Sequence, residues 1–135
     1  MLTYIELDDD MDRDGFKNFI NNNKDIVILK FSADWCGPCQ TIKPYIEESI
    51  QNLESFMKEN KTNKNVKFCE VIVDDYFDIY STLKQKKMVK GIPHIMCYFG
   101  KKNKDRLHYY ISDLSVSGTD KNEINNFFNL IKNHL

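Results

Sequence analysis

The sequence predicts an α/β fold in which helices cover both faces of a central sheet. Residues 26–31 and 66–73 are nearly continuous apolar runs, as expected for parallel strands that are buried on both faces. Between them, from residue 38 to about residue 60, apolar side chains recur at helical spacing. The chain has 135 residues, enough for one substantial core but not for two, so we expect a single domain over residues 1–135.

A short strand and a short helix are expected before the first buried run. The strand covers residues 2–7. Asp12 or Asp14 is the expected N-cap of the helix, and the asparagines at 21–23 end it. The inward face of this helix holds Phe16, Phe19 and Ile20.

A long helix and a second buried strand occupy the middle of the chain. We expect the helix over residues 38–60 to bend at Pro44 and to be followed by a polar loop at 60–65. After the strand at 66–73, a connection starts at 74–75 and leads into a further helix ahead of Gly91. One face of that helix is expected to hold Phe77, Tyr80 and Leu83.

The C-terminal third predicts a hairpin and a closing helix. Residues 95–99 and 107–111 are the expected strands, joined by a turn at 100–104, so this end of the sheet is antiparallel. Asp120 and Glu123 have capping-box spacing for the final helix. The apolar stripe of that helix consists of Ile124, Phe127, Phe128, Ile131 and Leu135.

Two cysteines separated by two residues follow the strand at 26–31, in the motif Trp35-Cys36-Gly37-Pro38-Cys39. A helix N-terminus favours an anion, so the pKa of the Cys36 thiol should fall below that of a free cysteine, making Cys36 a candidate nucleophile. Pro38 suits the first helical turn, and Cys39 is close enough to form a disulfide with Cys36. The motif therefore predicts a reversible thiol–disulfide switch.

This pentapeptide and its surroundings resemble the thioredoxin family over nearly the whole chain. A lone CxxC motif would also suit a zinc site or a structural disulfide. Four further segments match the family: the strand end at 31–34, a helix-kinking Pro44, the proline loop at 89–93, and the last strand and closing helix from 116 onward. The resemblance implies a thioredoxin fold, with a central mixed sheet of about five strands flanked by about four helices.

The resemblance also implies a function, that of a protein-disulfide oxidoreductase which takes part in electron transport and cell redox homeostasis. Cys36 would attack a substrate disulfide and Cys39 would resolve the mixed disulfide. The motif residues expected to support the pair are Trp35, Gly37 and Pro38. The substrate-binding residues are Gly91, Ile92 and a cis Pro93, with the backbone of Ile92 offered to an extended substrate.

The expected partners are disulfide-containing protein substrates and an upstream reductase of thioredoxin-reductase type. No cofactor is expected apart from the Cys36–Cys39 disulfide itself. Trp35 admits a second interpretation, as an ordinary core side chain. Two other functions remain open: a thioredoxin-fold binding or scaffold subunit with little turnover, and a disulfide oxidase or isomerase.

Two charged residues interrupt the predicted buried strands. Lys30 precedes Cys36 by six residues, and Glu70 lies in the neighbouring strand. Related proteins often carry an acid and a lysine at these positions, so the charges are exchanged here. Because a lone buried ion is costly, we expect the two to be partners behind Cys39. Glu70 would either accept the proton of Cys39 or serve a purely structural pair.

His94 stands where thioredoxins usually carry threonine. Its imidazole would either lie near the dithiol and tune the thiolate or point away from it. Cys69 and Cys97 are expected to be buried core thiols, and we expect no metal site and no iron–sulfur cluster. The lysines at 84–90 and the extension at 100–117 are either docking surfaces or solvated, inert segments.

Composition excludes some classes of partner. The formal net charge is −1, which argues against a dominant role on nucleic acid or a membrane surface. No segment is apolar over the length that a bilayer span requires, and the first residues do not resemble a signal peptide. We therefore expect a cytoplasmic protein, and a monomer.

Overall fold

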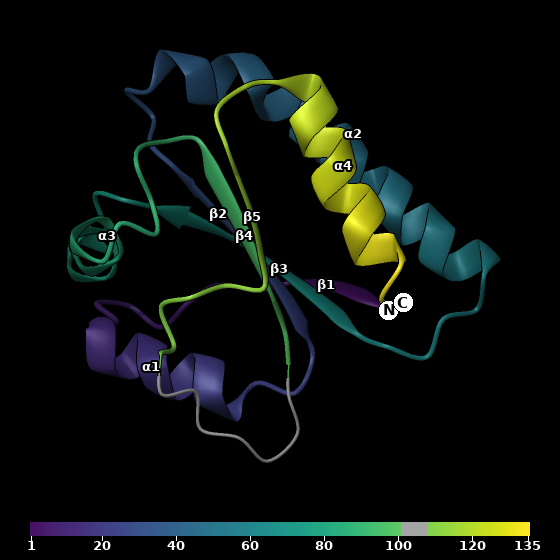
Figure 1. Ribbon diagram of the computed structural model, residues 1–135, viewed down its shortest axis with the longest axis horizontal. Coiled ribbons are helices and arrows are strands. Elements are labelled where there is room, and N and C mark those ends of the chain that lie inside the picture. The colour runs from purple at the N-terminus through teal and green to yellow at the C-terminus, as the bar shows by residue number, and fades with distance from the viewer. Residues whose placement is uncertain (101–107) are drawn as a thin grey trace.

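The computed structural model describes residues 1–100 and 108–135, which form a mixed sheet of five strands and four helices (Figure 1). In chain order the elements are β1 (Leu2–Tyr4), α1 (Arg13–Asn22), β2 (Ile26–Ser32), α2 (Gly37–Glu59), β3 (Val66–Ile72), α3 (Phe77–Gln85), β4 (His94–Phe99), β5 (Leu114–Ser117) and α4 (Lys121–Lys132). The α/β thioredoxin fold implied by the resemblance is thus confirmed.

The strands lie in the order β1-β3-β2-β4-β5. β3 runs parallel to β1 and β2, whereas β4 is antiparallel to β2 and β5. All seven residues of β2 are buried, because this strand has a neighbour on each side and helices on both faces. The predicted central strand and the antiparallel end of the sheet are both confirmed.

Each face of the sheet has its own apolar core. On one face, α1 and α3 pack on alternate residues of β2, namely Val27, Leu29 and Phe31. On the other face, α2 and α4 pack on Ile26 and Ile28. Figure 1 shows the two helix pairs on opposite sides of the strands. The alternation follows from the two-residue period of a strand.

The helix boundaries agree with the sequence signals. Asp12, rather than Asp14, is the N-cap of α1, and its side chain accepts a hydrogen bond from the backbone N–H of Gly15 at 2.8 Å. The side chain of Asp120 accepts from the backbone N–H of Asn122 and Glu123 and so caps α4. α2 contains Pro44, and its apolar residues at helical spacing are buried, namely Ile42, Ile46, Ile50, Leu53 and Met57.

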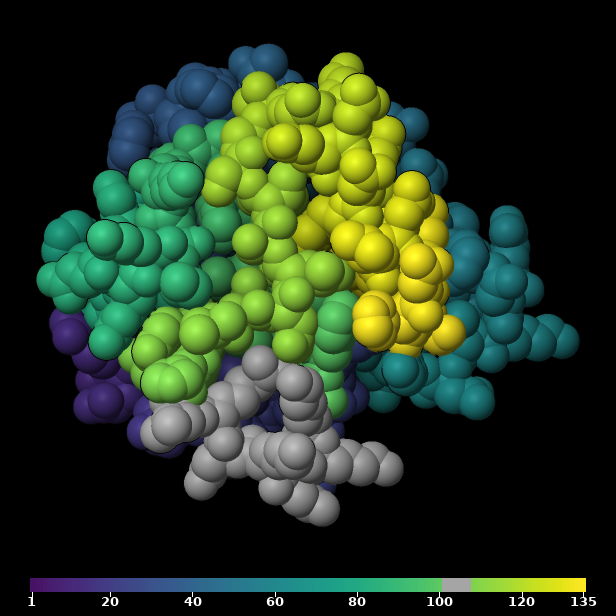
Figure 2. Space-filling view, in the orientation of Figure 1, coloured from purple at the N-terminus to yellow at the C-terminus, as the bar shows by residue number. Residues whose placement is uncertain are grey.

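The predicted strand at 107–111 is wrong. Residues 108–110 form a turn, while Leu107 and the predicted hairpin turn at 101–104 lie outside the described residues. The aromatic residues responsible for the strand prediction use their side chains for packing, since the ring of Tyr109 lies 6.1 Å from that of Phe16 in α1. The strand that pairs with the outer edge of β4 is β5, which includes Val116 and Ser117, where the resemblance placed the last strand. In Figure 2 this part of the chain lies on the surface between α3 and α4.

Two further expectations about packing need correction. Phe77 is 69% exposed, and the buried face of α3 holds Ile79, Thr82 and Leu83 instead. The ion pair of Arg13 with Asp78, at 2.6 Å, attaches the first turn of α3 to α1, and Phe77 remains on the outside. The first strand ends at Tyr4 rather than at residue 7, so β3 has a short neighbour on that side.

Candidate active site

The CxxC motif lies where β2 ends and α2 begins. Cys36 is the N-cap of α2, with extended backbone at φ −87° and ψ 106°, and Gly37 and Pro38 form the first helical positions. Cys36 and Cys39 are joined in a disulfide, with their Cα atoms 5.3 Å apart. The backbone N–H of Cys39 also donates to Sγ of Cys36 at 3.2 Å. A helix start thus provides both the closeness of the two sulfurs and an N–H donor for one of them.

The two cysteines differ in access. Cys36 is 5% exposed and Cys39 is 1% exposed. A substrate can therefore approach Cys36 more readily than Cys39. The unpaired N–H groups at the start of α2 and the helix dipole favour negative charge on the Cys36 sulfur. This difference suits Cys36 as the attacking thiol and Cys39 as the resolving one.

The proline loop lies beside the dithiol. The Ile92–Pro93 peptide bond is cis, as the resemblance implies. The Sγ atom of Cys36 is 3.8 Å from the carbonyl oxygen of Ile92, so the loop directly borders the more exposed sulfur. Gly91 precedes it, and a Cβ atom there would meet nothing within 4 Å. The backbone before Pro93 is therefore open to a ligand on that side.

Trp35 is a surface residue, which excludes the interpretation as a core side chain. It is 68% exposed, and its Nε1–H donates to a carboxylate oxygen of Asp74 at 2.8 Å. Asp74 follows the end of β3 after one intervening residue, at the same sheet edge as the end of β2, because the two strands are parallel. Asp74 was not among the site residues expected from the sequence. The signal for it was present, since residues that follow neighbouring parallel strands meet at one edge.

Gly37 is not required by the backbone. Its φ is not in the left-handed region, and a Cβ atom at this position would meet nothing within 4 Å. Gly37 is the first residue of α2, and a larger side chain would fit there. What the missing side chain does is leave open space next to Cys36.

Lys30 and Glu70 form the expected ion pair. Lys30 Nζ lies 3.0 Å from Glu70 Oε2, and the two residues are register partners on β2 and β3. The lysine side chain is only 3% exposed, whereas that of Glu70 is 36% exposed. The expectation that both are buried is wrong for Glu70, because β1 ends at Tyr4, opposite Phe68, and leaves Glu70 without a strand neighbour on that side. By alternation the pair lies on the sheet face covered by α2, whereas Cys36 and Cys39 belong to the apolar core of the opposite face.

His94 is the first residue of β4 and follows Pro93 directly. It is 3% exposed, and its ring lies 6.4 Å from that of Phe31, on the face that also contains Cys36 and Cys39 in its core. Nδ1 shares a hydrogen bond with Ser117 Oγ. Burial lowers the pKa of His94 to about 4, so the imidazole is neutral at neutral pH.

Cys69 and Cys97 are unpaired thiols buried in β3 and β4. Burial raises the pKa of Cys69 to about 11, and it raises that of Cys97 as well. Within residues 1–100 and 108–135, no group of three or more His, Cys, Asp or Glu side chains has a geometry that would hold a metal ion.

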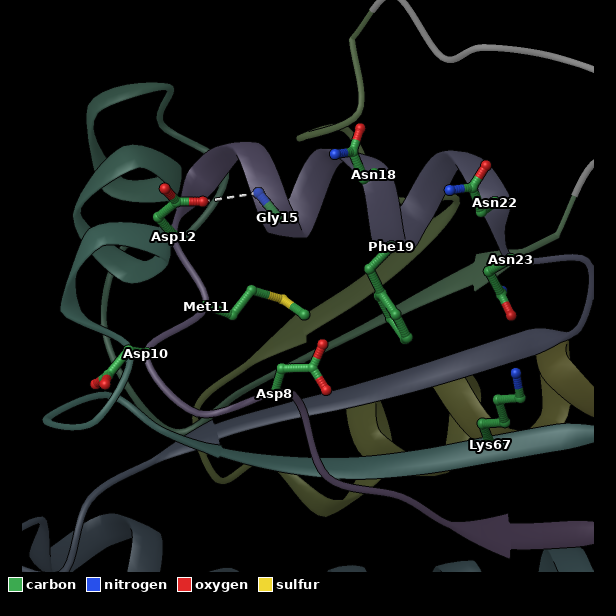
Figure 3. A pocket seen from close by; sticks show the side chains of 10 residues that line it. All are labelled: Asp8, Asp10, Met11, Asp12, Gly15, Asn18, Phe19, Asn22, Asn23 and Lys67. Atoms are coloured by element: carbon green, nitrogen blue, oxygen red, sulfur yellow. Dashed lines mark hydrogen bonds between the residues drawn. The ribbon is translucent and has the colours of Figure 1, made fainter.

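A hollow of about 570 Å³ lies away from the dithiol, beside α1 (Figure 3). Its acidic rim includes Asp8, Asp10 and Asp12, and Asp12 is already used as the cap of α1. Asn23 exchanges hydrogen bonds with the backbone of Asp25, and Lys67 is 3.4 Å from the carboxylate of Asp25. The hollow shares no residue with the dithiol or the proline loop and is not part of the candidate site.

The family model described as Thioredoxin matches residues 9–127, which include the CxxC motif, Pro93 and most of α4. The chain belongs to the thioredoxin family. Thioredoxins are thiol–disulfide oxidoreductases, and the chain carries a CxxC pair at disulfide distance in the expected place. It is therefore a thiol–disulfide oxidoreductase.

Curated relatives agree with this assignment. The chain is 34% identical over 98 residues to thioredoxin of Pongo abelii, covering 66% of this chain and 79% of the relative. It is 32% identical over 109 residues to thioredoxin of Sus scrofa, covering 74% and 90% of the two chains.

Solved structures support the fold. Thioredoxin O2 of Arabidopsis thaliana in its oxidised state matches with a TM-score of 0.61 at 15% identity, over 96% of this chain and 94% of the other. Oxidised thioredoxin of Plasmodium falciparum matches with a TM-score of 0.55 at 19% identity, over 98% of this chain and 99% of the other.

Among the described residues, no helix combines the length and apolarity needed to cross a bilayer.

Proposed function

We propose that this thioredoxin-family protein works as a reductase of protein disulfides. The observation that carries the proposal is the arrangement of Cys36 at the start of α2, with the carbonyl oxygen of Ile92 at 3.8 Å from its sulfur. An activated thiol and an open stretch of backbone therefore lie side by side. A substrate protein needs both, one for the chemistry and one to align its chain.

The proposed reaction moves two electrons from the dithiol to the substrate. The Cys36 thiolate attacks one sulfur of the substrate disulfide, forming a new S–S bond while the other substrate sulfur leaves as a thiolate. The thiolate of Cys39 then attacks Sγ of Cys36 and releases the second substrate sulfur. The products are a reduced substrate and the Cys36–Cys39 disulfide, which an upstream reductase of thioredoxin-reductase type reduces again.

Substrate binding is proposed to use backbone pairing. An extended segment of substrate would lie along Gly91, Ile92 and Pro93, as a short added strand. Trp35 would border it, held in place by its hydrogen bond to Asp74. Support for this comes from the open space at Gly91 and Gly37, where an added Cβ atom would meet nothing within 4 Å.

We propose that Glu70 receives the proton when Cys39 becomes a thiolate, with a water molecule as the link. Its carboxylate binds the buried ammonium of Lys30 and still reaches solvent, so it can pass a proton outward. A purely structural pair is the competing outcome, and a substitution of Glu70 distinguishes the two.

Insulin reduction in the presence of dithiothreitol tests the enzyme directly. The wild-type protein should accelerate precipitation of the insulin B chain, and Cys36→Ser should abolish the acceleration. Cys97→Ala is the matched control, because it also removes a buried thiol but one outside the CxxC motif, and it should retain turnover. A wild-type protein that gives no acceleration over dithiothreitol alone would favour a binding or scaffold subunit instead.

The direction of electron flow follows from the reduction potential of the Cys36–Cys39 couple. Equilibration in dithiothreitol buffers should give a value near about −270 mV, as for thioredoxin, if the protein is a reductase. A value near about −180 mV or above would assign it to oxidation or isomerisation. We propose a reducing compartment such as the cytoplasm, which the unpaired state of Cys69 and Cys97 supports.

A further inference from the structure

His94 links the proline loop to the edge strand of the sheet. It follows Pro93 directly and pairs in register with Phe31 on β2 and with Ser117 on β5. Its Nδ1 atom and Ser117 Oγ share a hydrogen bond between side chains that are 23 residues apart in sequence. Ser117 is itself exposed and ends an edge strand of four residues.

The residue after Ser117 touches the loop from the other direction. The backbone N–H of Gly118 donates to the carbonyl oxygen of Pro93 at 2.9 Å. Gly118 has φ +87°, a left-handed conformation that strains other residues, and it turns the chain toward the loop. The end of β5 is thus connected to His94 through Ser117 and to Pro93 through Gly118.

The imidazole occupies this position at a cost. Among residues 1–100 and 108–135, its buried Nε2 atom has no hydrogen-bond partner. An unpartnered buried polar group is destabilising, and an aliphatic side chain would avoid that cost. Because the ring is neutral, either Ser117 Oγ–H donates to Nδ1 or Nδ1–H donates to Ser117 Oγ, and one nitrogen is used in both cases.

We infer that His94 is a positioning residue for substrate binding: through Ser117 it fixes the Gly118–Pro93 contact, and thereby the backbone of Ile92 that receives an extended peptide. The inference rests on the proposed function and adds to it the residues that set affinity for peptide substrates. His94 does not touch the reacting sulfurs in this role. A substrate without a peptide backbone gains nothing from it.

Paired variants test the inference, because asparagine and glutamine mimic different nitrogens of histidine. The amide of His94→Asn can replace Nδ1 and keep the bond to Ser117, whereas that of His94→Gln replaces Nε2 and cannot. Ser117→Ala removes the bond from the other side. Ser115→Ala is the matched control, since Ser115 lies on the same face of β5 but opposite Met96, which has no polar side chain to bind.

The measurement compares KM for a disulfide-containing peptide with KM for bis(hydroxyethyl) disulfide. Ser117→Ala and His94→Gln should raise the ratio of the two KM values by roughly 2- to 10-fold, the factor expected for one hydrogen bond. The double variant His94→Gln/Ser117→Ala should raise it no further, while His94→Asn and Ser115→Ala should keep the wild-type ratio. Amide hydrogen exchange at Gly118 should quicken in Ser117→Ala, His94→Gln and the double variant, and in neither His94→Asn nor Ser115→Ala.

A wild-type ratio in Ser117→Ala overturns the inference, as do effects of the two substitutions that add up. Ser117 is exposed, so its variant folds even if His94→Gln does not. A wild-type protein that reduces the small disulfide but not the peptide contradicts the proposed function itself, and the inference falls with it.

Discussion

The four cysteines of this protein lie in two kinds of environment and have opposite chemical character. Cys36 and Cys39 stand at the start of α2 and form a disulfide, while Cys69 and Cys97 lie inside β3 and β4 and remain unpaired. All four are buried, with exposures of 5% or less. Burial alone therefore does not decide whether a thiol reacts.

The difference comes from the backbone around each sulfur. At a helix start the free N–H groups stabilise a thiolate, and one of them donates directly to Sγ of Cys36. Inside a strand the N–H groups are used by the sheet, so desolvation dominates and raises the pKa of Cys69 to about 11. The end of a strand is thus a place for chemistry, and its middle is a place for packing.

Trapping of a mixed disulfide should show the largest difference in reactivity between the CxxC cysteines and the two strand cysteines. In Cys39→Ser the resolving step is absent, so a substrate protein should accumulate in a covalent complex through Cys36. Non-reducing gel electrophoresis and mass spectrometry identify the linked cysteine. The double variants Cys39→Ser/Cys69→Ala and Cys39→Ser/Cys97→Ala should trap equally well, and linkage through Cys69 or Cys97 would break the comparison.

Acid should destabilise the folded protein through His94. Burial disfavours the charged form of this imidazole, as it disfavours the thiolate form of Cys69 and Cys97. Its folded pKa is lowered to about 4 from an ordinary 6.5, so between these values only the unfolded chain binds the proton. The contribution of His94 to the free energy of unfolding is fully present above pH 6.5 and falls by about 3 kcal/mol as the pH drops to 4.

Urea unfolding as a function of pH measures this effect. The difference in unfolding free energy between wild type and His94→Thr should change with pH by that amount, with the carboxylates common to both proteins cancelling. A constant difference across the range would show that His94 is not buried as a neutral ring.

Substitution of Glu70 tests whether a strand residue assists the reaction of the dithiol, and we expect a smaller effect than in the two preceding experiments. Glu70→Gln removes the partner of a buried ammonium, and because Glu70 is partly exposed we expect a loss of about 1–2 kcal/mol in unfolding free energy. The proposed proton transfer further predicts slower decay of the mixed disulfide in rapid-quench experiments. Glu48→Gln, an exposed carboxylate on α2, controls for charge. Lower stability with unchanged decay would leave only a structural pair.

The reactive end of the molecule was the more predictable one, because the sequence there determines backbone geometry locally. Cys36, Pro38 and Cys39 define a helix start, and the apolar run before them defines the central strand. Two further features could be predicted from the sequence. The cis bond at Pro93 followed from the family resemblance, and the Lys30–Glu70 ion pair followed from the cost of an unpaired buried charge.

Features that depend on distant parts of the chain were not predictable. The turn at 108–110 is set by Tyr109 packing on Phe16, against a local pattern that favours a strand. The exposure of Glu70 depends on where β1 ends, and the His94–Ser117 bond depends on the register of β5. Each of these is a tertiary contact that overrides or escapes local propensity.

Site-resolved alkylation of the reduced protein tests the central claim most directly. Iodoacetamide is applied over a range of pH, and mass spectrometry follows each of the four cysteines. Cys36 should react with an apparent pKa below the value of about 8.5 of a free cysteine, while Cys69 and Cys97 stay unmodified at neutral pH. A Cys36 that titrates at or above that value, or a strand thiol that reacts as fast, would contradict the account.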